Sequence, residues 1–202
     1  MKENNKKTLY FYLLITLTLL LSHISAQIAL PTFQGVHKVH SSASSNTPEN
    51  PLQSTGINEV GNYTWSYLLG YRFTPQVNGT ITQLGGYYNG TYTVYLWRWS
   101  DGNFLGSVSH TSNSGWSYTN LGSSVDVSSG TEYFVAVAMT GCCGSYIDYG
   151  SNDLPNTYGN ITINYAVYNS GNFNSNTMPS TFSNALRIDR TWGMPDITFI
   201  PD

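Results

Sequence analysis

Three aromatic side chains in one short segment have the residue types and spacing for ligand binding. Tyr95, Trp97 and Trp99 occupy alternate positions, so they share one face if the segment is a strand. If the intervening Val94 and Leu96 face a core, the aromatic face is exposed, and its rings and polar tips suit a sugar ring. The alternative is that the aromatics fill the core, where most large aromatic residues lie. The sequence favours burial of these three side chains in the core, and a ligand site on an exposed aromatic face is the second interpretation.

Two adjacent cysteines, Cys142 and Cys143, are the only cysteines of the chain. Neighbouring Cα atoms lie ~3.8 Å apart, below the ~4.4–6.8 Å usual for a disulfide, so a bond between them needs a distorted peptide. The glycines on either side supply backbone freedom for such a ring. A vicinal disulfide, two thiols and an intermolecular bridge therefore stay open. A rigid loop tip here would bring Tyr146 and Tyr149 into a ligand site.

Oxygen-bearing side chains follow in the same loop. Asp148, Asn152 and Asp153 could bind calcium, but their spacing does not match an EF-hand, and Asp and Asn are ordinary turn residues. A structural turn is the favoured interpretation. The sequence predicts no metal site and no cofactor.

Catalytic constellations are not evident. Beyond residue 26 the histidines are His37, His40 and His110, and no HExxH, GxSxG or paired-carboxylate spacing accompanies them. Glu132 lies in a predicted strand, where we expect it to be solvated. The sequence leans against an enzyme. A hydrolase or lyase with an unrecognised site remains a third hypothesis.

The N-terminus has the pattern of a secretory signal peptide. Three lysines precede an apolar run from Leu9 to Leu21, and Ser25-Ala26 resembles a cleavage site. As a helix the run would span ~20 Å, short of the ~30 Å hydrocarbon core of a bilayer. We expect cleavage after Ala26, with Gln27 as the first mature residue. The protein is then secreted or held at the cell surface, without membrane insertion after signal cleavage.

The charge balance excludes one class of partner. Residues 1–26 hold three lysines and one glutamate of the chain's 8 basic and 11 acidic residues, which leaves five basic and ten acidic. The five basic residues are scattered along the chain. Nucleic-acid binding requires a basic surface that displaces counterions, so it is not expected. A polybasic membrane patch is not expected either.

The chain divides into three parts: the signal peptide 1–26, an extended lead-in or linker 27–62, and one domain over 63–202. From Trp65 onward hydrophobic residues alternate with a period of two, and turn signals such as Asn89-Gly90 separate the segments. The segment Thr131–Met139 is apolar on both faces and should lie near the centre of a sheet. Eight to ten short strands predict an all-β fold, an antiparallel β-sandwich of jelly-roll type. The predicted strands are 65–74, 80–88, 91–99, 104–111, 116–127, 131–139, 161–168, 185–189 and 197–200.

Several segments resemble a known family. They are Leu69–Pro75, Gly79–Ile81, Tyr92–Trp97, Gly102–Leu105, Gly115-Trp116 and Gly130–Val135. Over about residues 65–168 this pattern resembles the bacterial domain-of-unknown-function family 4082. The resemblance implies an antiparallel sandwich of secreted or surface bacterial proteins, often found beside adhesion-like or carbohydrate-acting modules. The family has no assigned activity, so the resemblance implies no catalytic residue.

The leading functional hypothesis is a secreted, non-catalytic binding module for polysaccharide or a cell-surface glycan. It depends on the aromatic-rich surface, which carries little charge, and on analogy with the fold. The second hypothesis is a structural or adhesive surface protein that binds other proteins. The sequence leaves the oligomeric state open.

Overall fold

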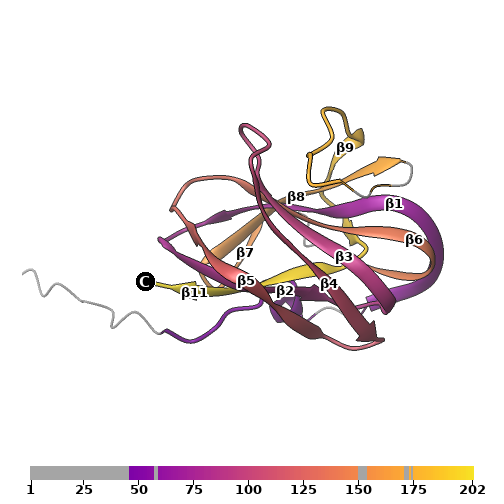
Figure 1. Ribbon diagram of the computed structural model, residues 1–202, viewed down its shortest axis with the longest axis horizontal. Helices are drawn as coiled ribbons and strands as arrows, with labels where there is room; N and C mark the ends of the chain where they lie inside the picture. Colours follow the sequence, from indigo (N-terminus) through magenta and orange to yellow (C-terminus); the bar gives the residue numbers. More distant parts are fainter. Residues whose placement is uncertain (1–45, 57–58, 150–153, 171–172, 174) are drawn as a thin grey trace, which may run out of the picture. The chain divides into compact units, whose positions relative to one another are not determined.

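A computed structural model describes the backbone of residues 46–56, 59–149, 154–170, 173 and 175–202, all within the unit 44–202. The predicted signal peptide and the lead-in up to residue 45 lie outside these residues. Every strand pair in the described part is antiparallel. Two sheets form a sandwich, which confirms the predicted fold class (Figure 1). No helix in the described part is long and apolar enough to cross a bilayer.

The larger sheet has eight strands. Six of them follow the order β4-β3-β6-β1-β8-β7, while β10 pairs with β6 and β9 with β8. Their bounds are β1 Glu59–Pro75, β3 Asn89–Arg98, β4 Phe104–Asn113, β6 Tyr133–Asp148, β7 Asn156–Tyr158, β8 Ile161–Ser170, β9 Ser183–Arg187 and β10 Arg190–Trp192.

The smaller sheet has the order β11-β2-β5, with β2 Gly79–Gly86, β5 Ser117–Val127 and β11 Pro195–Pro201. The main core lies between the two sheets. From β1 it takes Leu69, Tyr71 and Phe73, the residues that the period of two places on one face. Ile81 of β2 and Phe199 of β11 pack against them from the other sheet. The predicted inward face of β1 is therefore the core face.

A second apolar cluster covers the outer face of the larger sheet. Its buried members are Leu68, Tyr95, Trp97, Phe134, Ala136, Ala138 and Val167. Phe173, Met178 and Phe182, from the connection between β8 and β9, lie over them. Strand β6 is thus buried on both faces, as its sequence predicted, because this connection provides the cover on the outer side.

Strands β1 and β6 are much longer than the usual strand and bend together (Figure 1). Their register shifts twice between Val60 and Thr64, and β-bulges of this kind bend a sheet. Gly141 in β6 has φ +120°, a conformation that side-chain-bearing residues rarely adopt. The sequence pattern ended this strand at Met139, whereas pairing continues to Asp148 and there supports β10.

Ordered structure begins earlier than the predicted boundary at residue 63. Glu49 forms a β-bridge with Phe199, and Leu52 is fully buried in the main core. A short 3-10 turn, Gln53–Thr55, follows. Residues 49–56, here called the N-terminal clasp, lie against β11, so part of the predicted lead-in contacts the sandwich.

Candidate functional site

The predicted aromatic row of Tyr95, Trp97 and Trp99 lies within the described residues, and most of it is buried. Val94 and Leu96 face the main core, as the first interpretation assumed. The opposite face is nevertheless not exposed: Trp97 is fully buried and Tyr95 nearly so, beneath Phe173. The indole N–H of Trp97 donates to the carbonyl of Asn176 at 2.8 Å. The aromatic face therefore packs the outer cluster.

Trp99, the third member of the row, is half-buried. The Arg72 guanidinium lies 4.1 Å from its ring centroid, and Phe182 lies on it at 5.2 Å. Arg72 also forms an ion pair with Glu132, whose other oxygen accepts from Asn164 at 2.8 Å. Glu132 is thus paired, in contrast to the expected solvated side chain. Because Arg72 and Phe182 lie against the Trp99 ring, the ring does not offer an exposed face to a ligand.

The two tyrosines predicted as ligand-binding residues, Tyr146 and Tyr149, differ in burial and in their neighbours. Tyr149 is buried in the main core, where its hydroxyl lies 2.8 Å from Thr191 Oγ1. Tyr146 is half-buried and stands directly opposite Trp192 in the β6–β10 pair. Of the predicted site residues, Tyr146 is the one that lies beside the pocket described below.

The remaining predicted chemistry near residues 142–153 is only partly described. Cys142 and Cys143 lie in strand β6, but their side chains are outside the described residues, as are Asn152 and Asp153. Asp148 is 3.5 Å from Arg190 in an ion pair. Among the residues that the structure describes, no three His, Cys, Asp or Glu side chains gather to hold a metal ion.

His110 is a candidate general base that the fold uses structurally. Its Nδ1 lies 2.8 Å from Thr119 Oγ1 and its Nε2 lies 3.1 Å from Ser117 Oγ. Burial lowers the pKa of His110, so the ring is neutral at pH 7. A catalytic serine–histidine pair needs a carboxylate on the second nitrogen, and here a hydroxyl occupies that position. His110 joins β4 to β5 and thereby links the two sheets.

Asp196 is the most enclosed acid in the described part of the chain. Its carboxylate is fully buried and accepts hydrogen bonds from the backbone N–H groups of Leu52, Gln53 and Ile197. The hydroxyls of Tyr71 and Tyr118 donate to it at 2.8 and 3.0 Å. Burial outweighs these bonds and raises the pKa of Asp196 to about 6. A perturbed acid often marks a catalytic site, but this one is enclosed by donors and anchors the N-terminal clasp.

Asp196 predicts a dependence of stability on pH. Between the ordinary carboxyl pKa of about 4 and the folded value of about 6, the folded protein holds a proton that the unfolded chain has released. Its contribution to the free energy of unfolding should therefore fall as pH rises through this window, by roughly 3 kcal/mol. His110 contributes the opposite slope, because its pKa is lowered. Urea titrations of wild type and Asp196→Asn across the window separate the two. The free energy of unfolding of wild type minus that of the variant should fall by roughly 3 kcal/mol as pH rises through the window, and a difference that does not change with pH would contradict the assignment.

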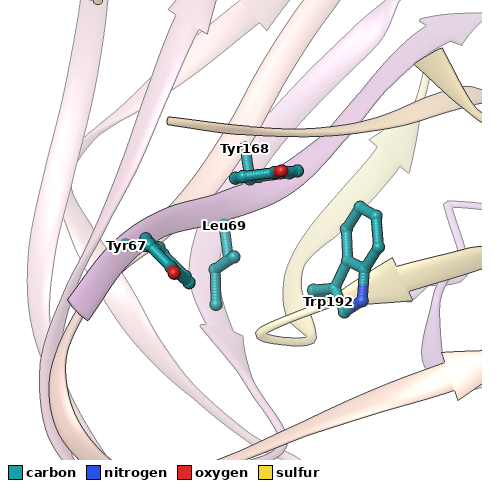
Figure 2. Close-up of a pocket in the computed structure, with 4 residues that line it drawn as sticks. All are labelled: Tyr67, Leu69, Tyr168 and Trp192. Carbon is teal, nitrogen blue, oxygen red and sulfur yellow. The ribbon is translucent and has the colours of Figure 1, made fainter. Parts of the chain in front are cut away.

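The candidate binding site is a pocket that lies where β1, β8 and β10 meet. Tyr67, Leu69, Tyr168 and Trp192 line a hollow of about 210 Å³. Figure 2 shows Leu69 between Tyr67 on one side and Trp192 on the other, with Tyr168 beside them. Leu69 is buried, so the base of the pocket belongs to the main core.

The three rings are inclined to one another. Tyr67 and Tyr168 have centroids 5.7 Å apart and planes at 51°, and Tyr168 meets Trp192 at 5.4 Å and 82°. Gly193, which follows Trp192, has no side chain, and a Cβ there would lie 2.6 Å from the Leu69 Cβ. This close approach brings the end of β10 onto the sheet and fixes Trp192 over the hollow.

The polar tips of the pocket are available to a ligand. Within the described residues, no hydrogen bond engages the hydroxyls of Tyr67 and Tyr168 or the indole N–H of Trp192, and none of these atoms is sealed from solvent. Arg187 lies 5.5 Å from the Trp192 ring centroid, with its guanidinium held by Asp189 at 2.6 Å. Apolar ring faces with a few hydrogen-bonding tips are typical of small-molecule sites. The arrangement can hold one ring-sized group by contact and orient it by hydrogen bonds.

None of the four lining residues was predicted from the sequence as a site residue. Tyr67 and Leu69 have the alternation of a core strand, and that pattern gives no signal for a pocket mouth. Trp192 belongs to a three-residue strand too short to show a period. The aromatic content of β8 and of the segment around residue 192 was the available signal, and only the fold brings the two together.

A comparison with known families identifies the family of this chain. The family model described as a domain of unknown function (DUF4082) matches residues 53–186, about two thirds of the chain. The chain therefore belongs to this family. No curated protein matches it.

Proposed function

We propose that this member of the DUF4082 family is a non-catalytic binding module that recognises polysaccharide or a cell-surface glycan through the pocket of Tyr67, Leu69, Tyr168 and Trp192. The observation that carries the proposal is an aromatic pocket whose three polar tips lack partners within the described residues. The four described lining residues include no carboxylate, imidazole or thiol, which favours binding over catalysis. Export through residues 1–26 is part of the proposal and depends on the sequence alone.

Sugar rings suit this pocket for two reasons. Their C–H faces are apolar enough to lie against an aromatic ring, and their hydroxyls can bond to the tyrosine hydroxyls and the indole N–H. The hollow of about 210 Å³ is below the ~300–1,000 Å³ of pockets for drug-sized ligands, so it admits a group the size of one ring. The low charge of the chain, 9% Asp, Glu, Lys and Arg, favours a neutral ligand.

Trp192→Ala tests the site. Trp192 supplies the wall of the pocket, and a central aromatic anchor typically contributes 2 kcal/mol or more, so affinity should fall more than tenfold. A polysaccharide pull-down panel identifies the retained glycan, and calorimetry with that glycan measures the affinity of wild type and variant.

Trp116→Ala is the matched control. Trp116 is also half-buried beside the main core and meets Tyr87 edge-on at 5.8 Å, much as Trp192 meets Tyr168. Its loss should cost similar packing and leave binding within twofold of wild type. If a folded Trp192→Ala protein binds the glycan with the affinity of wild type, the pocket is not the binding site. Retention of proteins instead of glycans would favour the structural or adhesive alternative.

A further inference from the structure

A pair of tyrosines continues the aromatic surface beyond the pocket. Tyr146 stands opposite Trp192 in the β6–β10 pair, so the two side chains lie on the same face, with Cβ atoms about 4.5–5.5 Å apart. Tyr63 meets Tyr146 at 5.6 Å between ring centroids. Ring contacts therefore join Tyr67, Tyr168 and Trp192 on one side and Tyr146 and Tyr63 on the other, and the β6–β10 pairing brings the two groups together at Trp192 and Tyr146.

The Tyr63 end of this aromatic surface is unusually exposed. Tyr63 is 43% exposed, and within the described residues only Val77 and Ile188 are comparably exposed large hydrophobic side chains. Tyr63 is therefore not part of either buried cluster, and its ring is accessible beside that of Tyr146. Contiguous apolar surface of this kind marks interaction sites.

Polar groups flank the exposed pair. The Arg190 guanidinium lies 5.2 Å from the Tyr146 ring centroid and pairs with Asp148 at 3.5 Å and Asp189 at 3.2 Å. The Arg190 and Asp148 side chains remain 32% and 40% exposed. Because Asp189 also pairs with Arg187, the two positive and two negative charges balance. The group supplies donors and acceptors without a net charge, which suits the hydroxyl groups of a neutral sugar.

We propose that Tyr63 and Tyr146 form a second sugar subsite, so that the ligand is a glycan chain that occupies the pocket with one unit and lies over this pair with the next. The proposal rests on the proposed function, because it extends the same site. The pocket alone would bind a single sugar; the tyrosine pair adds contact only for a chain of two or more units.

The test is a length series of oligosaccharides, from monosaccharide to hexasaccharide, prepared from the polysaccharide that wild type retains. For wild type, affinity should rise about tenfold from monosaccharide to disaccharide and then level off. Tyr63→Ala should lose this rise and keep the monosaccharide affinity. Tyr63→Phe should retain the rise, because the ring face supplies the contact.

Tyr165→Ala is the control, since Tyr165 is a half-buried tyrosine on the outer face, 5.6 Å from the Arg72 guanidinium. It should behave as wild type, and circular dichroism confirms that each variant is folded. Affinity that does not change with length, or an equal loss for all lengths in Tyr63→Ala, overturns the second subsite and leaves the pocket standing. A wild-type protein that binds no glycan of any length overturns the proposed function and this extension together.

Discussion

Asp196→Ala should lower the free energy of unfolding by about 4 kcal/mol at pH 7. The change deprives three backbone N–H groups and two tyrosine hydroxyls of their acceptor in a fully buried position. Each such group costs about 1–3 kcal/mol when it is left unpaired, and water entering the space recovers part of this. Urea denaturation followed by circular dichroism measures the change.

Asp196→Asn is the informative companion. The amide keeps one acceptor oxygen but turns an NH₂ group toward one pair of donors, Gln53 N–H and the Tyr118 hydroxyl. The hydroxyl can rotate to accept, whereas the backbone N–H cannot, so we expect a loss of about 1–2 kcal/mol. An alanine variant as stable as the asparagine variant would show that the carboxylate does not hold the N-terminal clasp.

Trp97→Ala should cost about 4 kcal/mol, in the range for a large aromatic side chain removed from a packed cluster. Trp97 stacks on Tyr95 at 5.2 Å and on Phe134 at 5.6 Å, and it anchors the β8–β9 connection through its N–H bond to Asn176. The denaturant midpoint should fall with an unchanged slope, which indicates lost stability and not a change in the unfolded state.

Trp99→Ala is the comparison within the same row. It is half-buried, so we expect a loss of about 1–2 kcal/mol, smaller than for Trp97. Glycan affinity, where the folded variants can be measured, should be unaffected in both. A stable Trp97→Ala protein that loses glycan binding would show that the aromatic row binds the ligand. This result would contradict the proposal that the pocket is the binding site.

The strands could be predicted because burial on one face produces alternating apolar residues, and burial on both faces produces a continuous apolar run. Alternation in β1 and the doubly apolar β6 both lie where the pattern placed them. What could not be predicted is which element covers the outer face. Val94 and Leu96 point into the main core, and their aromatic neighbours are buried too, because a connection distant in sequence lies over them. Exposure depends on such long-range cover, and periodicity carries no information about it.

The residues around the pocket also could not be predicted from the local sequence pattern. Tyr146 and Tyr149 looked equivalent in the sequence, but the pairing of β6 with β10 leaves Tyr146 beside Trp192, while Tyr149 hydrogen-bonds to Thr191 in the core. The pocket requires the continuation of β6 past Met139, where glycines and cysteines replace the apolar alternation. Neither that continuation nor the three-residue β10 has a local sequence signal.

The Glu49–Phe199 bridge has a mechanical consequence. Glu49 lies close to where the chain enters the described sandwich and Phe199 lies three residues before Asp202, so the bridge brings these two segments together. A pulling force between Asn46 and Asp202 would strain the Asp202 N–H bond to the Asn78 carbonyl at 3.0 Å and two bonds of the bridge, Glu49 N–H to Phe199 and Phe199 N–H to Glu49, at 2.7 and 2.8 Å. Because the bridge is antiparallel, these bonds would open one after another, and the clasp would separate from β11 before the strands that carry the pocket bear tension.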